Sequence, residues 1–212
     1  MRDLDAVTVD ALGTIVALRD PVPALRAGLA SRGIEREPAA VATAFAAEAA
    51  FYVPRSHEGR TPETLAALRR DCAAVFLSAL DAPLEPEAFV DDFVAALEFE
   101  QIPGAELGLD GLRSMGLRLA CVANWDISLP EHLASVGLAS RFDVIVSSAD
   151  ALAPKPNPAP FHVALARLGV QPARALHIGD SEADRLGAAA AGLRFAPTPV
   201  STLPARLRAE AA

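Results

Sequence analysis

Cysteine is scarce in this sequence, which has only Cys72 and Cys121 among its 212 residues. A single pair would be a thin framework for a chain of this length, so a small disulfide-stapled scaffold is excluded. Both residues lie inside apolar stretches, and we expect two reduced, buried thiols in a cytoplasmic protein. The apolar stretches are all shorter than the roughly 18 residues that a membrane-spanning helix needs, so we expect no membrane partner.

Basic side chains are also few, because 27 acidic side chains outnumber 19 basic ones and give a net charge of −8. The sequence has no basic run, which argues against nucleic acid or an anionic membrane surface as the main partner. Its first ten residues, MRDLDAVTVD, lack the basic region and apolar run of a secretory leader. A small anionic substrate would therefore need a local cation or a bound metal.

The sequence does contain an alternation of short apolar runs and helical patterns. Runs typical of buried strands occur at 5–10, 117–122, 144–146 and 175–178. Helical patterns with start and stop signals lie at 108–115, 129–136 and 158–168. Ser128 with Glu131 has the spacing of a capping box for the second of these helices. Alternating strands and helices predict an α/β fold with a doubly wound, parallel, Rossmann-like sheet.

The segment from 16 to 100 differs, because it contains four helical patterns and no convincing strand. Apolar residues recur there at helical spacing, most clearly between 65 and 80 and between 89 and 97. It lies between the first predicted strand and the next, so we interpret it as a helical insertion at the carboxyl edge of the sheet. Two domains are therefore predicted: a core of residues 1–15 and 101–212, and a helical cap of residues 16–100.

Asp10 is the first candidate functional residue. It ends the first predicted strand and precedes Gly13 and Thr14, so its carboxylate should stand on a turn that a ligand can approach. A carboxylate at this place can serve as a nucleophile or as a metal ligand. Capping of the next element, a purely structural role, is the competing interpretation.

Gly179 and Asp180 follow the last predicted strand and open a helix that contains Asp184. Carboxylates from two strands, with backbone carbonyls and water, suit Mg²⁺, which prefers near-octahedral oxygen coordination. Helix capping by Asp180 and a favourable interaction of Asp184 with the helix dipole are the structural alternative. Lys155 follows the third strand in a proline-rich loop, where it is placed to keep an aspartate ionised and to neutralise a transferring phosphoryl group.

Taken in order, these motifs resemble those of the haloacid dehalogenase superfamily, in its branch with an α-helical cap between the first and second motifs. The motifs read strand-Asp-x-x-Gly-Thr, strand-x-Asn, Lys-Pro and strand-Gly-Asp-x-x-x-Asp, and they span essentially the whole chain. The resemblance implies hydrolysis of a small phosphorylated molecule, with Asp10 as the nucleophile that forms an aspartyl-phosphate and Lys155 as the basic group. It also implies Mg²⁺ held by Asp10, the backbone carbonyl of Leu12 and Asp180.

The same resemblance assigns supporting roles to six further residues. These are Gly13 and Thr14 in the first loop, Ala123 and Asn124 in the substrate-binding second motif, and Gly179 and Asp184 in the fourth motif. No motif in the sequence specifies an oligomeric state.

Two positions depart from the family pattern. Phosphatases of the family have a second aspartate, which protonates the leaving group, at the position of Leu12, so alkyl phosphates should turn over slowly here. Ala123 stands where the family usually has a serine or threonine before Asn124. Leu12 also keeps two alternatives open: a 2-haloacid dehalogenase, which lacks the second aspartate too, and a degenerate relative that binds a phosphorylated ligand or a protein without turnover. The Gly179–Asp180 motif favours phosphorus chemistry.

The predicted cap supplies candidate substrate contacts. Its polar loop YVPRSHEGR contains Arg55 and His57, and caps in this family reach over the nucleophile. Histidine is the residue type that ordinarily exchanges a proton near neutral pH, so His57 is a candidate to replace the missing acid, and an exposed loop histidine is the competing interpretation. Trp125 and Asp126 directly follow Asn124 and are expected to line the pocket or to pack against the cap.

Overall fold

Five parallel strands form the central sheet of the computed structural model, which describes residues 4–210. In spatial order they are β5 (Val144–Ser147), β4 (Arg118–Ala123), β1 (Ala6–Val9), β6 (Ala175–Gly179) and β7 (Arg194–Pro197). Val7 and Val9 face one side of the sheet while Ala6 faces the other, so β1 is buried on both faces, as a central parallel strand must be. The predicted α/β class is confirmed.

The four apolar runs correspond to β1, β4, β5 and β6, whereas no sequence pattern predicts β7. Its sequence, RFAP, contains an arginine and a proline, which are tolerated because β7 is an edge strand. Residues 1–3 and 211–212, which the sequence analysis assigned to the two ends of the core, lie outside the described residues.

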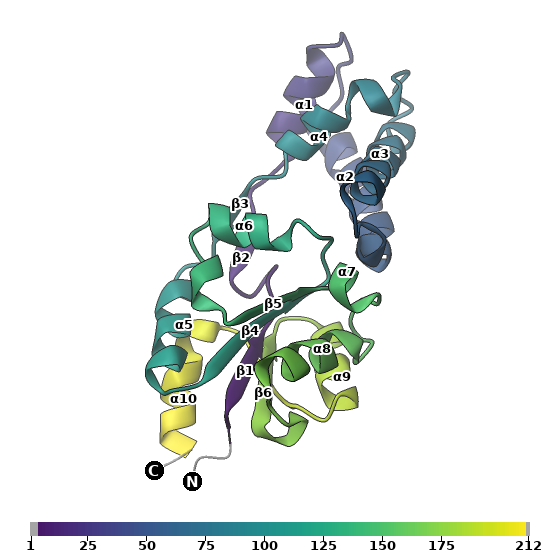
Figure 1. Ribbon diagram of the computed structural model, residues 1–212. Helices are drawn as coiled ribbons and strands as arrows, with labels where there is room; N and C mark the ends of the chain where they lie inside the picture. Colours follow the sequence, from purple (N-terminus) through teal and green to yellow (C-terminus); the bar gives the residue numbers. More distant parts are fainter. Residues whose placement is uncertain (1–3, 211–212) are drawn as a thin grey trace.

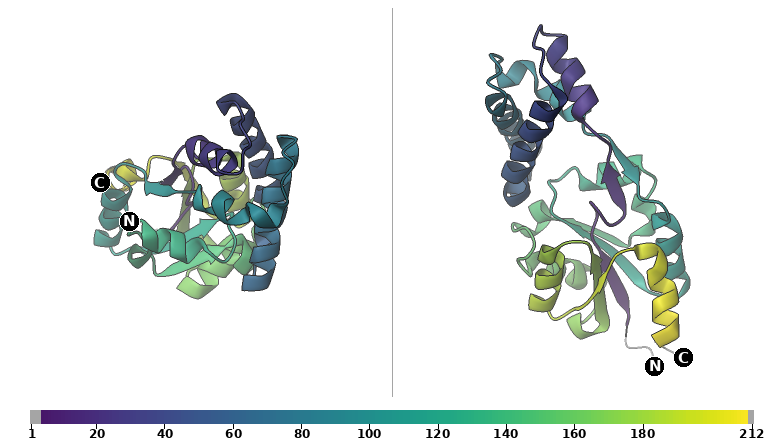
Figure 2. Two further views of the ribbon diagram at one scale, coloured as in Figure 1. Left: turned by 90° about the horizontal axis from the view of Figure 1, so that it is seen from above. Right: turned by 180° about the vertical axis from the view of Figure 1, so that it is seen from behind.

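Helices cover both faces of the sheet (Figures 1 and 2). One face packs against α5 (Ala105–Ser114), α6 (Leu129–Ser135) and α10 (Leu203–Glu210), and the other against α8 (Ala159–Leu168) and α9 (Glu182–Ala190). A one-turn helix, α7 (Ser148–Ala151), follows β5. Short 3₁₀ turns occur at Pro86–Ala88, Ala139–Arg141, Pro172–Arg174 and Val200–Thr202. Within the described chain, no helix combines the length and apolarity needed to cross a bilayer.

Ser128 does not cap α6, so the predicted capping box with Glu131 is wrong. Ser128 itself has helical backbone angles, and its hydroxyl donates to Asp126 Oδ1 at 2.6 Å. That carboxylate, two residues earlier, takes the hydroxyl away from the helix terminus and forms a local turn.

Between β1 and β4 the chain forms a helical bundle, which Figure 1 shows beyond the carboxyl ends of the strands. The bundle consists of α1 (Val22–Ala30), α2 (Pro38–Tyr52), the 3₁₀ helix η1 (Val53–Glu58), α3 (Pro62–Ala79) and α4 (Val90–Ala95). Its apolar residues form a cluster of their own, in which Phe76 stacks on Phe89 with ring centroids 5.8 Å apart. We call this bundle the cap.

Two short strands connect the cap to the sheet. β2 (Val16–Leu18) and β3 (Phe99–Gln101) pair antiparallel and form a narrow ribbon. The expectation of no strand between 16 and 100 is therefore wrong at both ends of that segment. Each strand has only three residues and is partly exposed, so neither produces an apolar alternation that a sequence pattern can reveal.

Candidate active site

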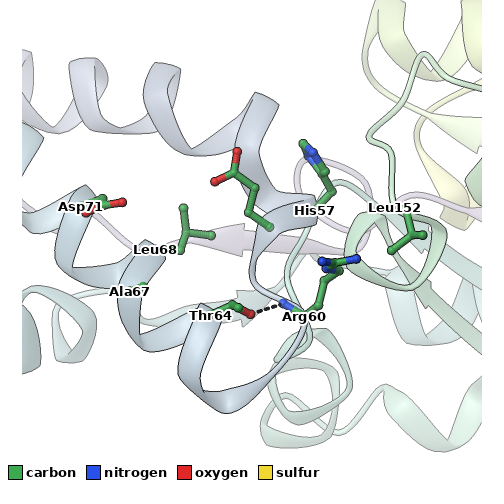
Figure 3. A pocket seen from close by; sticks show the side chains of 8 residues that line it. His57, Arg60, Thr64, Ala67, Leu68, Asp71 and Leu152 are labelled. Carbon is green, nitrogen blue, oxygen red and sulfur yellow. Dashed lines mark hydrogen bonds between the residues drawn. The ribbon is translucent and has the colours of Figure 1, made fainter.

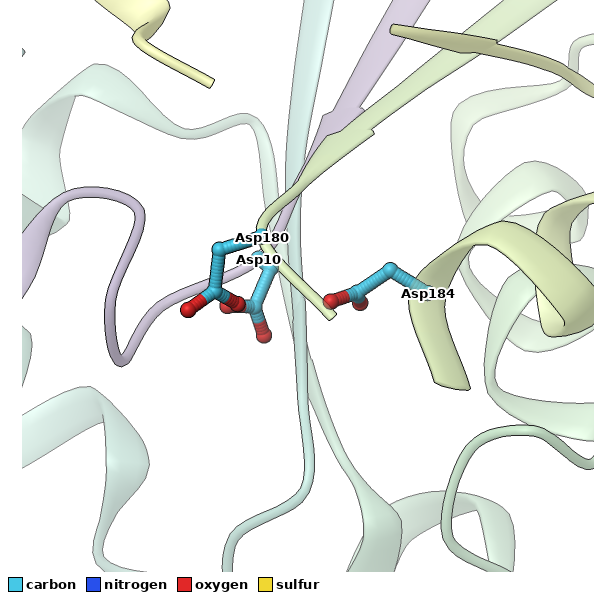
Figure 4. A group of neighbouring side chains, drawn as sticks. All are labelled: Asp10, Asp180 and Asp184. Carbon is cyan, nitrogen blue, oxygen red and sulfur yellow. The ribbon is translucent and has the colours of Figure 1, made fainter. Parts of the chain in front are cut away.

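Three carboxylates meet where β1 and β6 end (Figure 4). Asp10 directly follows β1, Asp180 directly follows β6, and Asp184 lies in the first turn of α9. One carboxylate oxygen of each lies within 4.8 Å of the others. β1 and β6 are paired parallel strands, so their carboxyl ends bring residues from opposite ends of the chain to one edge of the sheet.

The Lys155 ammonium lies between two of these carboxylates. Its Nζ donates to Asp10 Oδ1 at 2.5 Å, to Asp184 Oδ1 at 2.6 Å and to the Val122 carbonyl at 2.9 Å. An ammonium has three donor hydrogens, and all three have acceptors here. Only 5% of Lys155 is exposed, so solvent screens these ion pairs poorly. The lysine therefore fixes the Asp10 carboxylate and neutralises part of the acidic cluster.

Burial and mutual repulsion determine the ionisation of the cluster. Desolvation raises the pKa of Asp10, and the adjacent Asp184 charge adds to the rise against the opposing effect of Lys155. Desolvation also acts to raise the pKa of Asp184, but His177 and Lys155 outweigh it and hold that pKa below its usual range. Burial, followed by the Asp184 charge, raises the pKa of Asp180. A divalent cation bound here would favour the ionised forms of Asp10 and Asp180.

Asn124 holds the loop that carries Lys155. Its side-chain amide donates to the Lys155 carbonyl at 3.0 Å, and its Oδ1 accepts from the Lys155 backbone amide at 2.6 Å. The reciprocal pair locks the end of β4 to the loop after α7. Ala123, the last residue of β4, is 2% exposed, and its methyl group offers no hydrogen-bond donor.

The loop after β1 approaches Asp180 closely. Thr14 Oγ1 donates to Asp10 Oδ2 at 3.1 Å. Gly13 has a φ of +83°, and a Cβ atom there would lie 2.0 Å from Asp180 Oδ2, so only glycine fits. Leu12 is 47% exposed. Within residues 4–210, no backbone amide donates to its carbonyl.

His177 supports the cluster from behind, a role that the sequence analysis missed. It is fully buried in β6, and its Nε2 lies 2.9 Å from Asp184 Oδ1. Its Nδ1 lies 2.9 Å from Thr8 Oγ1 on the neighbouring strand. The same Nδ1 lies 3.0 Å from the Thr8 carbonyl, and burial lowers the pKa of His177. The imidazole thereby orients Asp184, which in turn holds Lys155.

The oxygen donors of the cluster fit Mg²⁺. Asp184 already accepts from Lys155 and His177 through Oδ1 and from Ser181 through Oδ2, so it acts as an orienting group. No other residue in the described part of the chain donates to the Asp180 carboxylate, and Asp10 Oδ2 accepts only from Thr14. The Asp180 carboxylate, Asp10 Oδ2 with its single hydrogen bond and the Leu12 carbonyl are the hard oxygen ligands that Mg²⁺ prefers.

An apolar cavity of about 260 Å³ lies between the cap and the sheet. Leu12 and Asn124 connect its wall to the carboxylate cluster, and four aromatic residues contribute much of the rest: Phe45, Phe93, Phe99 and Trp125. Tyr52 also lines the cavity, and its hydroxyl donates to Asp126 Oδ2 at 2.9 Å. The residues after Asn124 thus line the pocket and contact the cap at the same time.

Arg55 and His57 are not among the residues that line this cavity. The Arg55 guanidinium lies 4.2 Å from the centroid of the Phe51 ring and pairs with Glu58 at 3.7 Å. His57 lines a second pocket, of about 460 Å³, together with residues of α3 and with Leu152 (Figure 3). The structure therefore places the two predicted cap contacts away from the wall that Leu12 and Asn124 form.

Comparison with known proteins gives a family match over most of the chain. The model of the haloacid dehalogenase-like hydrolases matches residues 4–192. The haloacid dehalogenase-like hydrolase domain-containing protein 3 of Bos taurus is 41% identical over 125 residues, which are 58% of this chain and 47% of that protein. A phosphoglycolate phosphatase of Cereibacter sphaeroides is 38% identical over 95 residues, 44% of this chain and 43% of that protein. The chain spans less than half the length of either relative.

Solved structures share the fold over nearly the whole chain. The L-2-haloacid dehalogenase from Xanthobacter autotrophicus has a TM-score of 0.71 at 21% identity and covers 97% of this chain and 98% of its own. A HAD phosphatase from Thermococcus onnurineus has a TM-score of 0.63 at 23% identity and covers 96% of this chain and 98% of its own. At this identity the likeness concerns the fold, with its sheet and its cap.

Proposed function

The chain belongs to the haloacid dehalogenase-like hydrolase family, and we propose that it hydrolyses a phosphate ester or anhydride of a small molecule. The observation that carries this proposal is that the Asp10 and Asp180 carboxylates meet beside the buried Lys155. A phosphoryl group is anionic, so its transfer needs local positive charge, which Lys155 and a bound Mg²⁺ would provide. The relatives named phosphoglycolate phosphatase support phosphorus chemistry.

In the proposed reaction an Asp10 carboxylate oxygen attacks phosphorus, and the bond from phosphorus to the leaving-group oxygen breaks with its electron pair. Lys155 holds the other Asp10 oxygen and offsets the charge that develops on the phosphoryl group. Water then attacks the acyl phosphate on Asp10, the carboxylate is released, and inorganic phosphate departs. Mg²⁺, held by Asp10, Asp180 and the Leu12 carbonyl, would supply further electrostatic stabilisation of the phosphoryl oxygens.

Leu12 restricts the leaving groups that this site can expel. Its side chain has no proton to donate, and general acid assistance contributes roughly a hundred- to ten-thousand-fold to such reactions. We therefore infer slow turnover of alkyl phosphates and a preference for leaving groups that depart as anions, such as aryl oxides and carboxylates.

Trapping the acyl phosphate tests the nucleophile. Brief incubation with acetyl phosphate and Mg²⁺ should add one phosphoryl group to the wild-type chain in its intact-mass spectrum, and Asp10→Asn should gain none. Asparagine keeps nearly the same shape, so loss of labelling with an unchanged thermal transition would identify a nucleophile and not a structural residue. An unlabelled wild type that also leaves p-nitrophenyl phosphate untouched would contradict the proposal and favour a non-catalytic binder.

Calorimetry with Mg²⁺ tests the metal site. Asp180→Asn removes one of two formal charges from the proposed ligand set, so Mg²⁺ affinity should fall roughly tenfold or more. Glu182→Gln is the matched control, because Glu182 is an exposed acid two residues later that pairs with Arg185. Equal affinity in the wild type and Asp180→Asn would rule the site out.

Dehalogenation is the second candidate, and the combination of Leu12 with an apolar cavity favours it. A carbon–halogen bond breaks without a protonated leaving group, and the reaction needs no metal. An ester on Asp10 formed from a 2-haloacid, with halide release that persists in Asp180→Asn and in the presence of a chelator, would select this activity over phosphate hydrolysis.

A further inference from the structure

The cavity between the cap and the sheet is lined by an arginine for which no ion pair is found among residues 4–210. Arg69, on α3, is half-buried and lines the cavity wall. Among residues 4–210 it makes no hydrogen bond and no ion pair, whereas its neighbour Arg70 lies 3.9 Å from Glu87. The Arg69 charge adds to the effect of burial in lowering the pKa of His132 on α6, so it acts across the interface between cap and core.

Neither acidic residue of the same wall, Asp126 or Glu48, forms an ion pair with Arg69 among residues 4–210. The Asp126 carboxylate is already engaged, because Tyr52 donates to its Oδ2 and Ser128 donates to its Oδ1. A guanidinium in an apolar setting is stabilised by a planar anion such as a carboxylate, which it binds through two parallel hydrogen bonds. The wall is therefore complementary to an anionic ligand.

The rest of the cavity is complementary to an apolar group. A cavity of roughly 150 Å³ lined by aliphatic and aromatic residues holds benzene, and this cavity measures about 260 Å³. Phe45, Phe93 and Phe99 supply ring surfaces, and Leu12 lies where the cavity meets the acidic cluster. The space suits an aromatic ring with one substituent.

We propose that the substrate is an aryl phosphate that carries a carboxylate on its apolar group, with this carboxylate bound by Arg69. The inference rests on the proposed function and narrows its substrate class. It also accounts for Leu12, because an aryl oxide leaves as an anion and needs no proton donor at that position. The phosphoryl group would then lie at Asp10 while the ring fills the cavity and its carboxylate lies on Arg69.

A probe without phosphorus tests the cavity separately from catalysis. Isothermal titration calorimetry should show that 4-phenylbutanoate binds the wild-type protein more tightly than the neutral 4-phenylbutanamide. Arg69→Gln should weaken the binding of 4-phenylbutanoate roughly ten- to a hundredfold, the usual range for the loss of a charged hydrogen bond. The affinity for 4-phenylbutanamide should not change. Arg70→Gln, the matched control on the exposed side of α3, should change neither affinity.

The inference would be overturned if Arg69→Gln lost the same factor of affinity for 4-phenylbutanoate and for 4-phenylbutanamide. It would also be overturned if neither probe bound to the wild type. Because neither probe carries a phosphoryl group, failure to label Asp10 would overturn the proposed function and leave a positive binding result intact. Steady-state kinetics supply the second readout. The ratio of kcat/KM for 4-(carboxymethyl)phenyl phosphate to that for phenyl phosphate should be about ten or more in the wild type and near one in Arg69→Gln. Faster turnover of phosphoglycolate than of either aryl phosphate would overturn the apolar part of the inference.

Discussion

At the scale of single residues, the backbone and the side chain of Leu12 bear on different steps: the carbonyl on metal binding, and the side chain on protonation of the leaving group. Its carbonyl is free to act as a ligand whatever the side chain is, so loss of the usual aspartate does not by itself destroy a metal site. Its side chain is 47% exposed at the mouth of the cavity. A carboxylate introduced there would stay in contact with water and would carry little desolvation cost.

Leu12→Asp should therefore restore acid catalysis without damaging the fold. We expect kcat/KM for an alkyl phosphate such as glycerol phosphate to rise by up to a hundred- to ten-thousand-fold, far more than for p-nitrophenyl phosphate. The nitrophenolate leaves readily without a proton, so an added acid helps it least. Leu12→Asn has the same shape without a titratable proton and should give no gain. An equal gain for both substrates, measured by phosphate release, would show that the missing acid is not what limits the reaction.

Asp10, Lys155, Asp180 and Asp184 could be placed together from the sequence, because residues that follow parallel strands must meet at one edge of the sheet. The roles of Arg69 and His177 could not be predicted in this way. Arg69 precedes Arg70 on a helix, and which of two adjacent arginines faces a cavity depends on how that helix packs. His177 occupies an alternating strand position that a buried apolar residue would fill equally well, so no local pattern distinguishes it.

At the scale of elements, α2 and α3 pack through a buried polar pair that the helical periodicity does not reveal. Glu48 on α2 is 5% exposed, and Cys72 on α3 is 3% exposed. Desolvation raises the pKa of Glu48, and the thiol hydrogen bond from Cys72 partly opposes it. A group whose pKa is raised in the folded state favours folding below its unfolded pKa, and this stabilisation is lost as the pH rises through the folded pKa.

Glu48→Gln should consequently be more stable than the wild type at pH 7, where the buried carboxylate is ionised at a cost in free energy. The difference in the free energy of unfolding should shrink as the pH falls toward the unfolded pKa of glutamate, about 4.3. Urea denaturation at pH 7 and pH 4 measures both values. Glu35→Gln, at an exposed position, should show no such pH-dependent difference. The prediction would be contradicted if the free energy of unfolding of Glu48→Gln, minus that of the wild type, were smaller at pH 7 than at pH 4.

At the scale of the whole molecule, the cavity depends on how firmly the cap is held over the sheet. Besides the β2–β3 ribbon, three pairs of residues within 4–210 make polar contacts between the two parts: Tyr52 with Asp126 at 2.9 Å, Ser56 with Ser148 at 2.7 Å, and the Ile127 amide with the Gly59 carbonyl at 3.0 Å. The cap has its own apolar cluster, separate from those of the sheet. A body with its own core and few polar contacts to its neighbour can open without unfolding.

Tyr52→Phe tests whether the cap opens in this way. The substitution removes the hydroxyl that donates to Asp126 Oδ2 and accepts from the Asp126 amide, which should weaken the closed state by about 1–2 kcal/mol. The Ile127 amide spans the interface, so its hydrogen exchange, followed by NMR, should accelerate roughly five- to thirtyfold. The Leu119 amide in β4 donates to Asp143 within the core and should keep its wild-type rate. If the exchange rates of both amides rose by the same factor, exchange would occur through global unfolding and the cap would not open separately from the core. Substrate would then have to enter the cavity while the cap stays closed.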